Sequence, residues 1–270
     1  MPFVAFDLQG TLFTFNKVID KIQETLKNTK VPDIITSSQQ QQTAKRFFEY
    51  WYYSALCEYI ACSQAGTYES LRNVMNATLA RAFVCYFDVN EIETILDEPS
   101  RWIDSIMQAA FDDMELAVDA IEALNLLLKE NEGREYGWDI WILSSYSGLK
   151  ETIELLKRTG LSAFIEEENI ISCDDLKISK PHPKVYSELM RTAVHKTKRI
   201  ESFYLIGSHA YDLAGAKNMS LKTVFLNTTE KIYIRPLYDD HHKPDLIGSN
   251  LVDCVKKMME YENMKKHGVV

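Results

Sequence analysis

Residues 3–11 read FVAFDLQGT and place a carboxylate and a glycine directly after a short apolar run. Residues 3–6 are continuously apolar where a half-exposed strand would alternate, which is typical of a strand buried on both faces of a parallel sheet. Asp7 comes at the carboxyl end of that strand, and Gly10 allows a tight turn beside it. By themselves these two residues fit a catalytic role no better than a purely structural one, in which Asp7 caps a helix and Gly10 turns the chain. The stretch predicts a buried strand that ends in a candidate catalytic carboxylate.

Three more short apolar runs predict buried strands later in the chain. They are residues 140–143 (IWIL), 204–206 (YLI) and 223–226 (TVFL). Apolar residues at three- and four-residue spacing predict helices at residues 118–130, 148–159 and 183–194. The last of these helices opens with Pro183, which suits a first helical turn. Strands that alternate with helices predict right-handed βαβ units, and hence an α/β fold with a doubly wound parallel sheet.

Residues 16–110 interrupt this pattern, because they contain no clear strand and indicate about four helices. The strongest helical pattern, residues 46–63, is crowded with aromatic side chains, which either form the core of a helix bundle or wall a substrate pocket. Residues 37–42 (SSQQQQ) are interpreted as a surface loop that leads into this helix. We therefore predict an α/β core domain of residues 1–15 and 111–270. A helical cap domain of residues 16–110 is inserted into it.

Composition and charge narrow the function classes. The chain has a net charge of −9 with acidic and basic residues mixed along it, which argues against a nucleic-acid or anionic-membrane partner. The negative net charge is still compatible with a small anionic substrate, because a local cationic site can form inside an acidic protein. The five cysteines show no Cys-x-x-Cys spacing, which is typical of free thiols in a reducing compartment. The sequence shows neither a signal-peptide pattern nor a run of about 18 apolar residues, so we expect a cytoplasmic protein.

Polar residues follow the predicted strands in a fixed order. After Asp7, the second strand ends in Ser144 and Ser145, which offer hydroxyls for an anion site or for capping a helix. Lys180 precedes a helix in the stretch KPHP, where it is either a counter-charge for carboxylates or part of a surface loop. Asp212 follows another apolar strand in IGSHAYD, where it is either a site residue or a helix cap. The carboxyl ends of parallel strands form the ligand crevice of a doubly wound sheet. The order therefore predicts one site that gathers all four motifs.

This order of motifs resembles that of the haloacid dehalogenase superfamily. In the resemblance, Asp7 stands in motif I, Ser144 in motif II, Lys180 in motif III and Asp212 in motif IV. It covers most of the chain, and it implies a Rossmann-like core with a helical cap inserted after motif I. Within the superfamily, the chain is most similar to the type II 2-haloacid dehalogenases. The shared patterns are FD-x-x-GTLF at the start, ILS at motif II, KP-x-P-x-VY at residues 180–186 and GSHAYDLAGA at residues 207–216.

The resemblance implies a hydrolase with a covalent ester intermediate and a small carboxylate substrate. Asp7 attacks the carbon that bears the leaving group, and water then hydrolyses the ester. Lys180 keeps Asp7 ionised, and Asp212 orients or activates the water. The implied catalytic residues are Asp7, Lys180, Asp212 and Ser144. The implied substrate-binding residues are Gln9, Thr11, Ser145, Tyr52, Tyr186, Ser208 and His209.

The substrate shell departs from the dehalogenase pattern. Gln9 stands where those enzymes have tyrosine, and Gly207 and His209 stand where they have serine and asparagine. Tyr52 aligns with the arginine of the first cap helix that receives the halide, while Arg46 lies about a turn and a half earlier. His209 is either a general base near neutral pH or a loop histidine. Because of these differences, the sequence does not identify the leaving group of the reaction.

Two alternatives stay open beside the dehalogenase-like reading, which needs no cofactor and no metal. The first is a Mg²⁺-dependent phosphatase of the same fold, with Asp7, the Gln9 carbonyl and Asp212 around the metal. It is weakened because Gln9 replaces the general acid of the phosphatases and Ser208 replaces their first aspartate in motif IV. The second is a catalytically altered protein with a binding or biosynthetic role. The resemblance also makes a homodimer possible.

Overall fold

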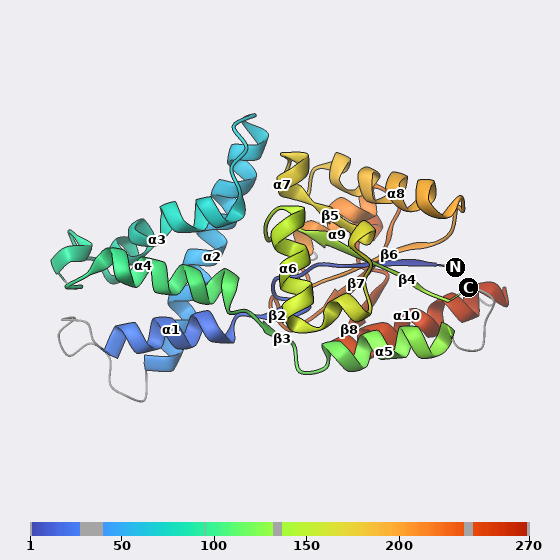
Figure 1. Ribbon diagram of the computed structural model, residues 1–270, viewed down its shortest axis with the longest axis horizontal. Helices are drawn as coiled ribbons and strands as arrows, with labels where there is room; N and C mark the ends of the chain where they lie inside the picture. Colours follow the sequence, from blue (N-terminus) through green and yellow to red (C-terminus); the bar gives the residue numbers. More distant parts are fainter. Residues whose placement is uncertain (1, 28–39, 95, 132–136, 235–239, 269–270) are drawn as a thin grey trace. The chain divides into compact units, whose positions relative to one another are not determined.

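The chain forms two compact units in the computed structural model (Figure 1). One unit comprises residues 1–13 and 116–270 and is α/β, and the other comprises residues 14–115 and is helical. The chain passes between the units through the two short paired strands β2 (Phe13–Thr14) and β3 (Glu115–Leu116). The residues that the structure describes are 2–27, 40–94, 96–131, 137–234 and 240–268.

The α/β unit is built on a six-stranded parallel sheet with strand order β5-β4-β1-β6-β7-β8. The strands are β1 (Phe3–Phe6), β4 (Asp139–Ser144), β5 (Ile170–Ser172), β6 (Phe203–Gly207), β7 (Lys222–Leu226) and β8 (Leu246–Gly248). β1 lies between β4 and β6, and its four residues are all buried. The doubly wound parallel sheet is therefore confirmed, as are the four predicted strands. β5 and β8 were missed because each has three residues, too few to produce a recognisable pattern.

Helices cover both faces of this sheet, with α8 on one side and α5 and α10 on the other (Figure 1). The helices are α5 (Ala120–Asn131), α6 (Leu149–Thr159), α7 (Cys173–Leu176), α8 (Pro183–Thr197), α9 (Ala210–Asn218) and α10 (Leu251–Lys266). Phe3 and Ala5 pack with Val185 and Leu213 in the core on the α8 side. The helix expected from residue 118 begins at Ala120 instead, and Val118 is fully exposed in the preceding turn.

The helical unit contains α1 (Asn16–Lys27), α2 (Gln40–Gln64), α3 (Leu71–Phe87) and α4 (Pro99–Met107), followed by a π-helix (Gln108–Asp112). The aromatics of α2 build its core. Phe47 and Trp51 are fully buried, and the Trp51 indole donates a hydrogen bond to the Met75 carbonyl at 3.1 Å. The loop expected at residues 37–42 is wrong for 40–42, which form the first turn of α2, because glutamine is a good helix former. Residues 37–39 lie outside the described part.

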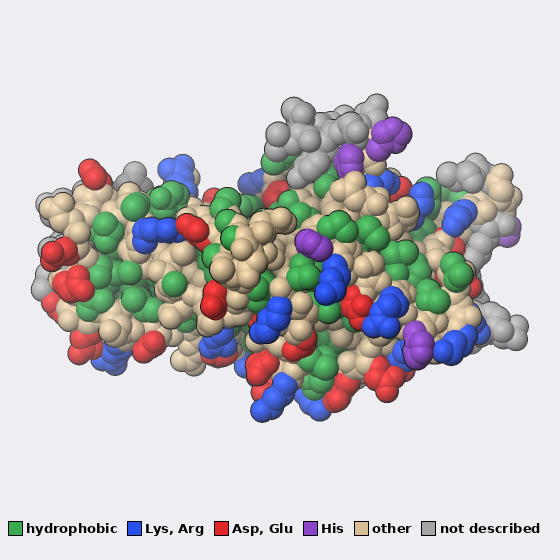
Figure 2. Space-filling model, turned by 90° about the horizontal axis from the view of Figure 1, so that it is seen from above, with side chains coloured by type: hydrophobic (Ala, Val, Ile, Leu, Met, Phe, Trp, Pro, Cys, Tyr) green, Lys and Arg blue, Asp and Glu red, His purple; other side chains and the backbone are tan. Residues whose placement is uncertain are grey.

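The surface keeps the mixed charge pattern of the sequence. On the face shown in Figure 2, lysine and arginine side chains are interspersed with aspartate and glutamate. Among the described residues, no helix is long and apolar enough to cross a membrane. That the helical unit serves as a cap, and that it spans residues 16–110, stays a prediction.

Candidate active site

Two buried carboxylates and a buried lysine meet at the carboxyl ends of β1 and β6. Asp7 directly follows β1, Asp212 lies in the first turn of α9 after β6, and Lys180 comes three residues before α8. Lys180 Nζ donates to Asp7 Oδ1 at 2.9 Å and to Asp212 Oδ2 at 2.8 Å. The Lys180 side chain is 2% exposed, so the surface-loop reading of this residue is wrong. The parallel sheet thus brings together three of the four residues predicted to be catalytic.

The charges of this cluster set its protonation states. Burial alone would raise the pKa of Asp7, but the charge of Lys180 and a hydrogen bond with His209 outweigh it and lower the pKa to about 2. Burial and the neighbouring charge of Asp7 raise the pKa of Asp212 above its ordinary value. Burial would lower the pKa of Lys180, yet the two carboxylates raise it further than burial lowers it. Asp7 is therefore an ionised carboxylate and Lys180 an ammonium at neutral pH.

Asp212 is held on both of its carboxylate oxygens. Its Oδ2 accepts from Lys180, and its Oδ1 accepts from the Tyr186 hydroxyl at 2.7 Å. The same hydroxyl also lies 3.0 Å from the Asp212 carbonyl oxygen. Tyr186 is fully buried on α8, so the helix that follows Lys180 also anchors Asp212. In this arrangement Asp212 fixes Lys180, and Lys180 in turn fixes Asp7.

Gly215 lets α9 approach this anchor closely. A Cβ at Gly215 would lie 2.7 Å from both the Tyr186 hydroxyl oxygen and the Pro181 Cβ. Alanine improves helix propensity by about 1 kcal/mol, but overpacking a buried contact costs about 1–3 kcal/mol. We expect Gly215→Ala to lower the free energy of unfolding by a net of up to about 2 kcal/mol, and to lower activity by moving Tyr186 away from Asp212. Urea unfolding and initial rates measure both effects. Increased stability together with unchanged activity would contradict the close contact.

Hydroxyls and an imidazole surround the second oxygen of Asp7. Thr11 Oγ1 lies 3.5 Å from Asp7 Oδ2 and 3.4 Å from Ser208 Oγ. His209 Nδ1 lies 3.8 Å from Asp7 Oδ2 and 3.4 Å from Ser208 Oγ. All three of these neighbours of Asp7 are buried, at 2% exposure or less. Lys180 binds Oδ1 of Asp7, and Oδ2 faces the hydroxyl of Thr11 and the imidazole of His209.

Two other predicted residues lie at the carboxyl end of β4, where Ser144 is the last residue of the strand and Ser145 follows it. Ser144 Oγ accepts from the Tyr146 amide at 3.0 Å, which holds the turn after β4. Ser145 Oγ lies 3.6 Å from the sulfur of Cys173, at the end of β5. The helix expected at residues 148–159 begins at Leu149 with Gly148 at its N-cap, so neither serine caps it. Their roles in catalysis and in substrate binding stay predictions.

Gln9 belongs to the α/β unit and Tyr52 to the helical unit. Gln9 pairs with Phe13 through a backbone bridge, and Gly10 has a φ of 76° in the turn between them. Asp7 therefore precedes a tight turn, and the helix-cap reading of Asp7 is wrong. Tyr52 is buried in the helical unit, where its ring lies 4.8 Å from that of Phe15. The substrate-binding roles of Gln9 and Tyr52 stay predictions.

The structure adds residues that sequence reasoning missed. Glu230 Oε2 accepts the amide of Ala210 at 2.9 Å, at the start of α9. Thr229 Oγ1 donates to the carbonyl of Gly10 at 3.1 Å. Both residues belong to the loop after β7, so they tie this loop to the motif I turn and to α9. Thr229 and Glu230 reach the site because β7 pairs with β6 in the sheet. No residue spacing in the sequence predicts this.

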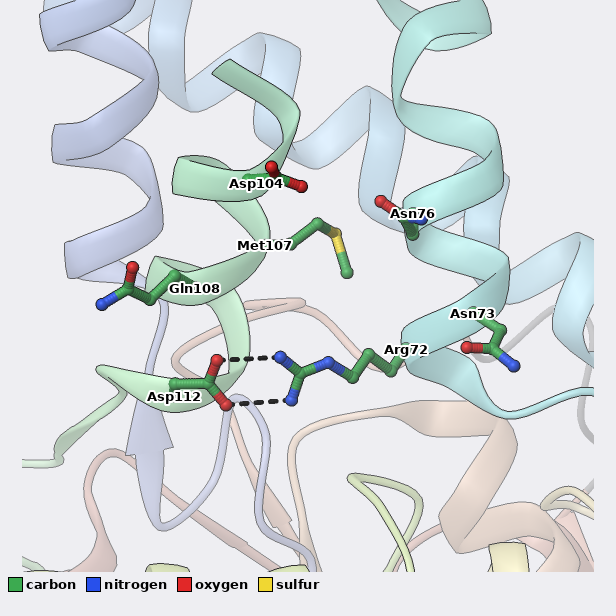
Figure 3. A pocket seen from close by; sticks show the side chains of 7 residues that line it. All are labelled: Arg72, Asn73, Asn76, Asp104, Met107, Gln108 and Asp112. Carbon is green, nitrogen blue, oxygen red and sulfur yellow. Dashed lines mark hydrogen bonds and ion pairs between the residues drawn. The ribbon is translucent and has the colours of Figure 1, made fainter. Parts of the chain in front are cut away.

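A polar pocket of about 440 Å³ lies between α3 and α4 of the helical unit (Figure 3). Across it Arg72 forms two hydrogen bonds with Asp112, at 2.9 and 2.8 Å. The sequence predicted that the aromatic residues of α2 form either a bundle core or the wall of a substrate pocket. The buried ones form the core of the helical unit. None of them lines this pocket, whose walls are mostly polar. Its lining residues are Arg72, Asn73, Asn76, Asp104, Met107, Gln108 and Asp112.

The oxygen donors near Asp7 are poorly arranged for Mg²⁺. Among the described residues, no group of three or more His, Cys, Asp and Glu side chains is placed to hold a metal ion. Asp7 Oδ1 and Asp212 Oδ2, two of the expected donors, both contact the Lys180 ammonium. The residues as arranged do not provide the oxygen-rich shell that Mg²⁺ requires.

Comparisons with known proteins agree with this architecture. A family model described as haloacid dehalogenase-like hydrolase matches residues 48–226. Haloacetate dehalogenase H-2 of Moraxella sp. (strain B) is 26% identical over 229 residues, which are 83% of this chain and 84% of that protein.

Solved structures show the same fold. The L-2-haloacid dehalogenase of Xanthobacter autotrophicus superposes with a TM-score of 0.65 and 19% identity, over 95% of this chain and 98% of that chain. Another dehalogenase structure gives a TM-score of 0.70 and 19% identity, over 97% and 96% of the two chains. The family model covers more than half of the chain, and the fold agrees with it, so the resemblance found in the sequence is confirmed. The chain belongs to the haloacid dehalogenase-like hydrolase family and is a hydrolase.

Proposed function

We propose that this hydrolase cleaves the carbon–halogen bond of a small 2-haloacid, with Asp7 as the nucleophile. The observation that carries the proposal is the Lys180 ammonium, which lies between Asp7 Oδ1 and Asp212 Oδ2. It keeps Asp7 ionised, as a nucleophile must be, and it leaves Oδ2 for attack. The name of the Moraxella relative, haloacetate dehalogenase, supports a haloacetate as the first substrate to try.

The first step is a displacement at the halogen-bearing carbon. Asp7 Oδ2 attacks that carbon, the new C–O bond forms an ester, and halide leaves with the electron pair of the C–X bond. Halide is a weak base and leaves without a proton. Gln9, whose amide cannot donate a proton near neutral pH, is therefore compatible with this leaving group, whereas an alkyl phosphate needs an acid.

The second step returns the free enzyme. Water attacks the Asp7 carboxyl carbon, the bond to the substrate oxygen breaks, and a 2-hydroxy acid leaves. Asp212 and Tyr186 hold Lys180 in place through both steps. We assign the hydroxyl of Thr11, which contacts Asp7 Oδ2, and that of Ser208, which contacts Thr11, to the substrate carboxylate. Neutral donors suit this task, because Lys180 is already committed to two carboxylates.

The proposal is tested by measuring halide and phosphate release side by side. The enzyme is given chloroacetate, 2-chloropropionate and a panel of phosphate esters, each with Mg²⁺ and with a chelator. We expect halide release that the chelator leaves unchanged, together with a mass increase on the peptide that contains Asp7 when the reaction is quenched early. Phosphate release that requires Mg²⁺, without halide release, would overturn the proposal.

A further inference from the structure

The loop that follows β7 contacts two segments that carry the site. Thr229 Oγ1 donates to the Gly10 carbonyl at 3.1 Å, and Glu230 Oε2 accepts the Ala210 amide at 2.9 Å. Gly10 lies in the tight turn that follows Asp7, and Ala210 is the first residue of α9. Two consecutive loop residues therefore hold the turn after β1 and the start of α9 together. We call Thr229 and Glu230 the bracket.

The loop is fixed to the sheet on both sides of the bracket. On one side the Asn227 amide donates to the carbonyl of Gly248 in β8 at 3.0 Å. On the other side the buried Tyr233 ring packs on Phe225 of β7, with 5.3 Å between ring centres. The Tyr233 hydroxyl also donates to the His242 carbonyl at 2.7 Å. The bracket is therefore held by its surroundings, as a residue that positions a site must be.

Glu230 provides the capping oxygen at the start of α9. His209 occupies the N-cap position of this helix, but its side chain makes no capping hydrogen bond. It lies 3.8 Å from Asp7 Oδ2 instead. The first amides of a helix need acceptors from outside the helix, and the helix dipole favours a carboxylate there. The position of the first turn of α9, which carries Asp212, thus depends on Glu230.

The bracket also joins the two segments that carry the hydroxyls of Thr11 and Ser208. Thr11 follows Gly10 directly, and Ser208 lies two residues before Ala210. The two hydroxyl oxygens lie 3.4 Å apart. Two donors serve one carboxylate only if their spacing is kept, because hydrogen bonds weaken steeply when they stretch or bend. We propose, on the basis of the proposed function, that the bracket sets the spacing of these two hydroxyls for the substrate carboxylate.

The bracket acts through the backbone of its two partner segments, so Thr229 and Glu230 are positioning residues. Their loss leaves the ion pair of Asp7 with Lys180 in place, and the nucleophile stays ionised. The substrate carboxylate is then held less firmly and less well aligned. A misplacement of about 1 Å in an active site costs about 10²-fold in rate. The expected signature of a broken bracket is weaker carboxylate binding together with slower turnover.

The experiment compares Glu230→Ala, which removes the acceptor, with Glu230→Gln, whose amide oxygen still accepts the Ala210 amide. Thr229→Val removes the hydroxyl and keeps the shape of the side chain, and a double variant combines it with Glu230→Ala. Asn250→Ala is the matched control, because Asn250 caps α10 in the same unit by accepting the Asp253 amide at 2.8 Å. For each protein kcat and KM are measured with chloroacetate. The inhibition constant of acetate, an unreactive carboxylate, and the urea midpoint are measured as well.

We expect Glu230→Ala and Thr229→Val each to lower kcat/KM by about 10- to 100-fold. The inhibition constant of acetate should rise by about 3- to 10-fold, as for the loss of one hydrogen bond. Glu230→Gln should stay within about 3-fold of wild type in both quantities, because it keeps the acceptor. Either single substitution opens the same bracket, so the loss in the double variant should be smaller than the product of the single losses.

The control separates positioning from stability. Asn250→Ala should lower the urea midpoint about as much as Glu230→Ala, since both remove the cap of a helix, yet leave kcat/KM within about 2-fold of wild type. An equal loss of kcat/KM in Asn250→Ala would overturn the inference. So would equal losses in Glu230→Gln and Glu230→Ala, or an unchanged inhibition constant of acetate in the bracket variants. Thr229→Val keeps the test decisive if Glu230→Ala does not fold.

The proposed function fails in a different way. If wild type releases no halide from any haloacid, the proposed function is wrong, and the role of the bracket falls with it. If wild type releases halide and Glu230→Ala and Thr229→Val match it in kcat/KM, the proposed function stands and only the inference on the bracket is overturned.

Discussion

Asp7→Asn is expected to lower the rate of halide release from chloroacetate by at least about 10⁴-fold, because the amide is a poor nucleophile and no ester forms. The loss should appear in the first turnover as well as in the steady state. Halide release measured over one and many turnovers checks it, together with the unchanged mass of the peptide that contains residue 7.

The fold should survive this substitution. In Asp7→Asn, Lys180 keeps its ion pair with Asp212 at 2.8 Å, so no buried charge is left unpaired. Asp20→Asn is a suitable control, because Asp20 is exposed on α1. Residual activity within tenfold of wild type, in a folded Asp7→Asn protein, would rule out Asp7 as the nucleophile.

Lys180→Met is expected to be the second most damaging change. Methionine has nearly the same shape, but it leaves the carboxylates of Asp7 and Asp212 buried without a counter-charge. Breaking a buried ion pair from one side costs about 3–5 kcal/mol of folding stability. We expect a loss of this order in urea unfolding at pH 7. We also expect a loss of about 10²- to 10³-fold in kcat, the size typical for removal of one key electrostatic contact from an active site.

The pH profile of Lys180→Met gives a sharper test. In wild type the charge of Lys180 lowers the pKa of Asp7 to about 2, so Asp7 stays ionised above pH 4. Without Lys180, burial raises the pKa of Asp7, and the nucleophile becomes protonated as the pH falls. We expect the residual activity of the variant to rise with pH over a range where Asp7 causes no change in wild type. Lys184→Met, an exposed position on α8, is the control, and identical profiles would contradict this role of Lys180.

Local sequence was enough to predict the strands that carry the site. Residues 3–6, 140–143, 204–206 and 224–226 form continuous runs of buried apolar or aromatic side chains, as burial on both faces of a parallel sheet favours. The order of the polar residues after these strands also predicted that Asp7 would meet Lys180 and Asp212, because parallel strands present their carboxyl ends on one edge. β5 and β8 were not predictable in the same way, since each becomes a strand only by pairing with the sheet at its edge.

Side-chain partnerships were harder to predict than positions. Nothing in the sequence indicates that Tyr186 and Lys180 together occupy both oxygens of Asp212. The approach of His209 to Asp7 depends on the registers of β1 and β6, which lie about 200 residues apart in the sequence. The cytoplasmic location, the homodimer and the exclusion of nucleic-acid and membrane partners stay predictions from composition and resemblance.

The sequence by itself determined the family, the α/β fold with its helical insertion and the group of charged residues at the sheet edge. It could do so because strand burial, turn formation and motif order are encoded in short runs of residues. Only the tertiary structure decided which oxygen of Asp7 is bound by Lys180 and that Asp212 is anchored by Tyr186. It alone also put the imidazole of His209 beside the nucleophile. These contacts join residues far apart in the chain, and their distances depend on how strands and helices pack.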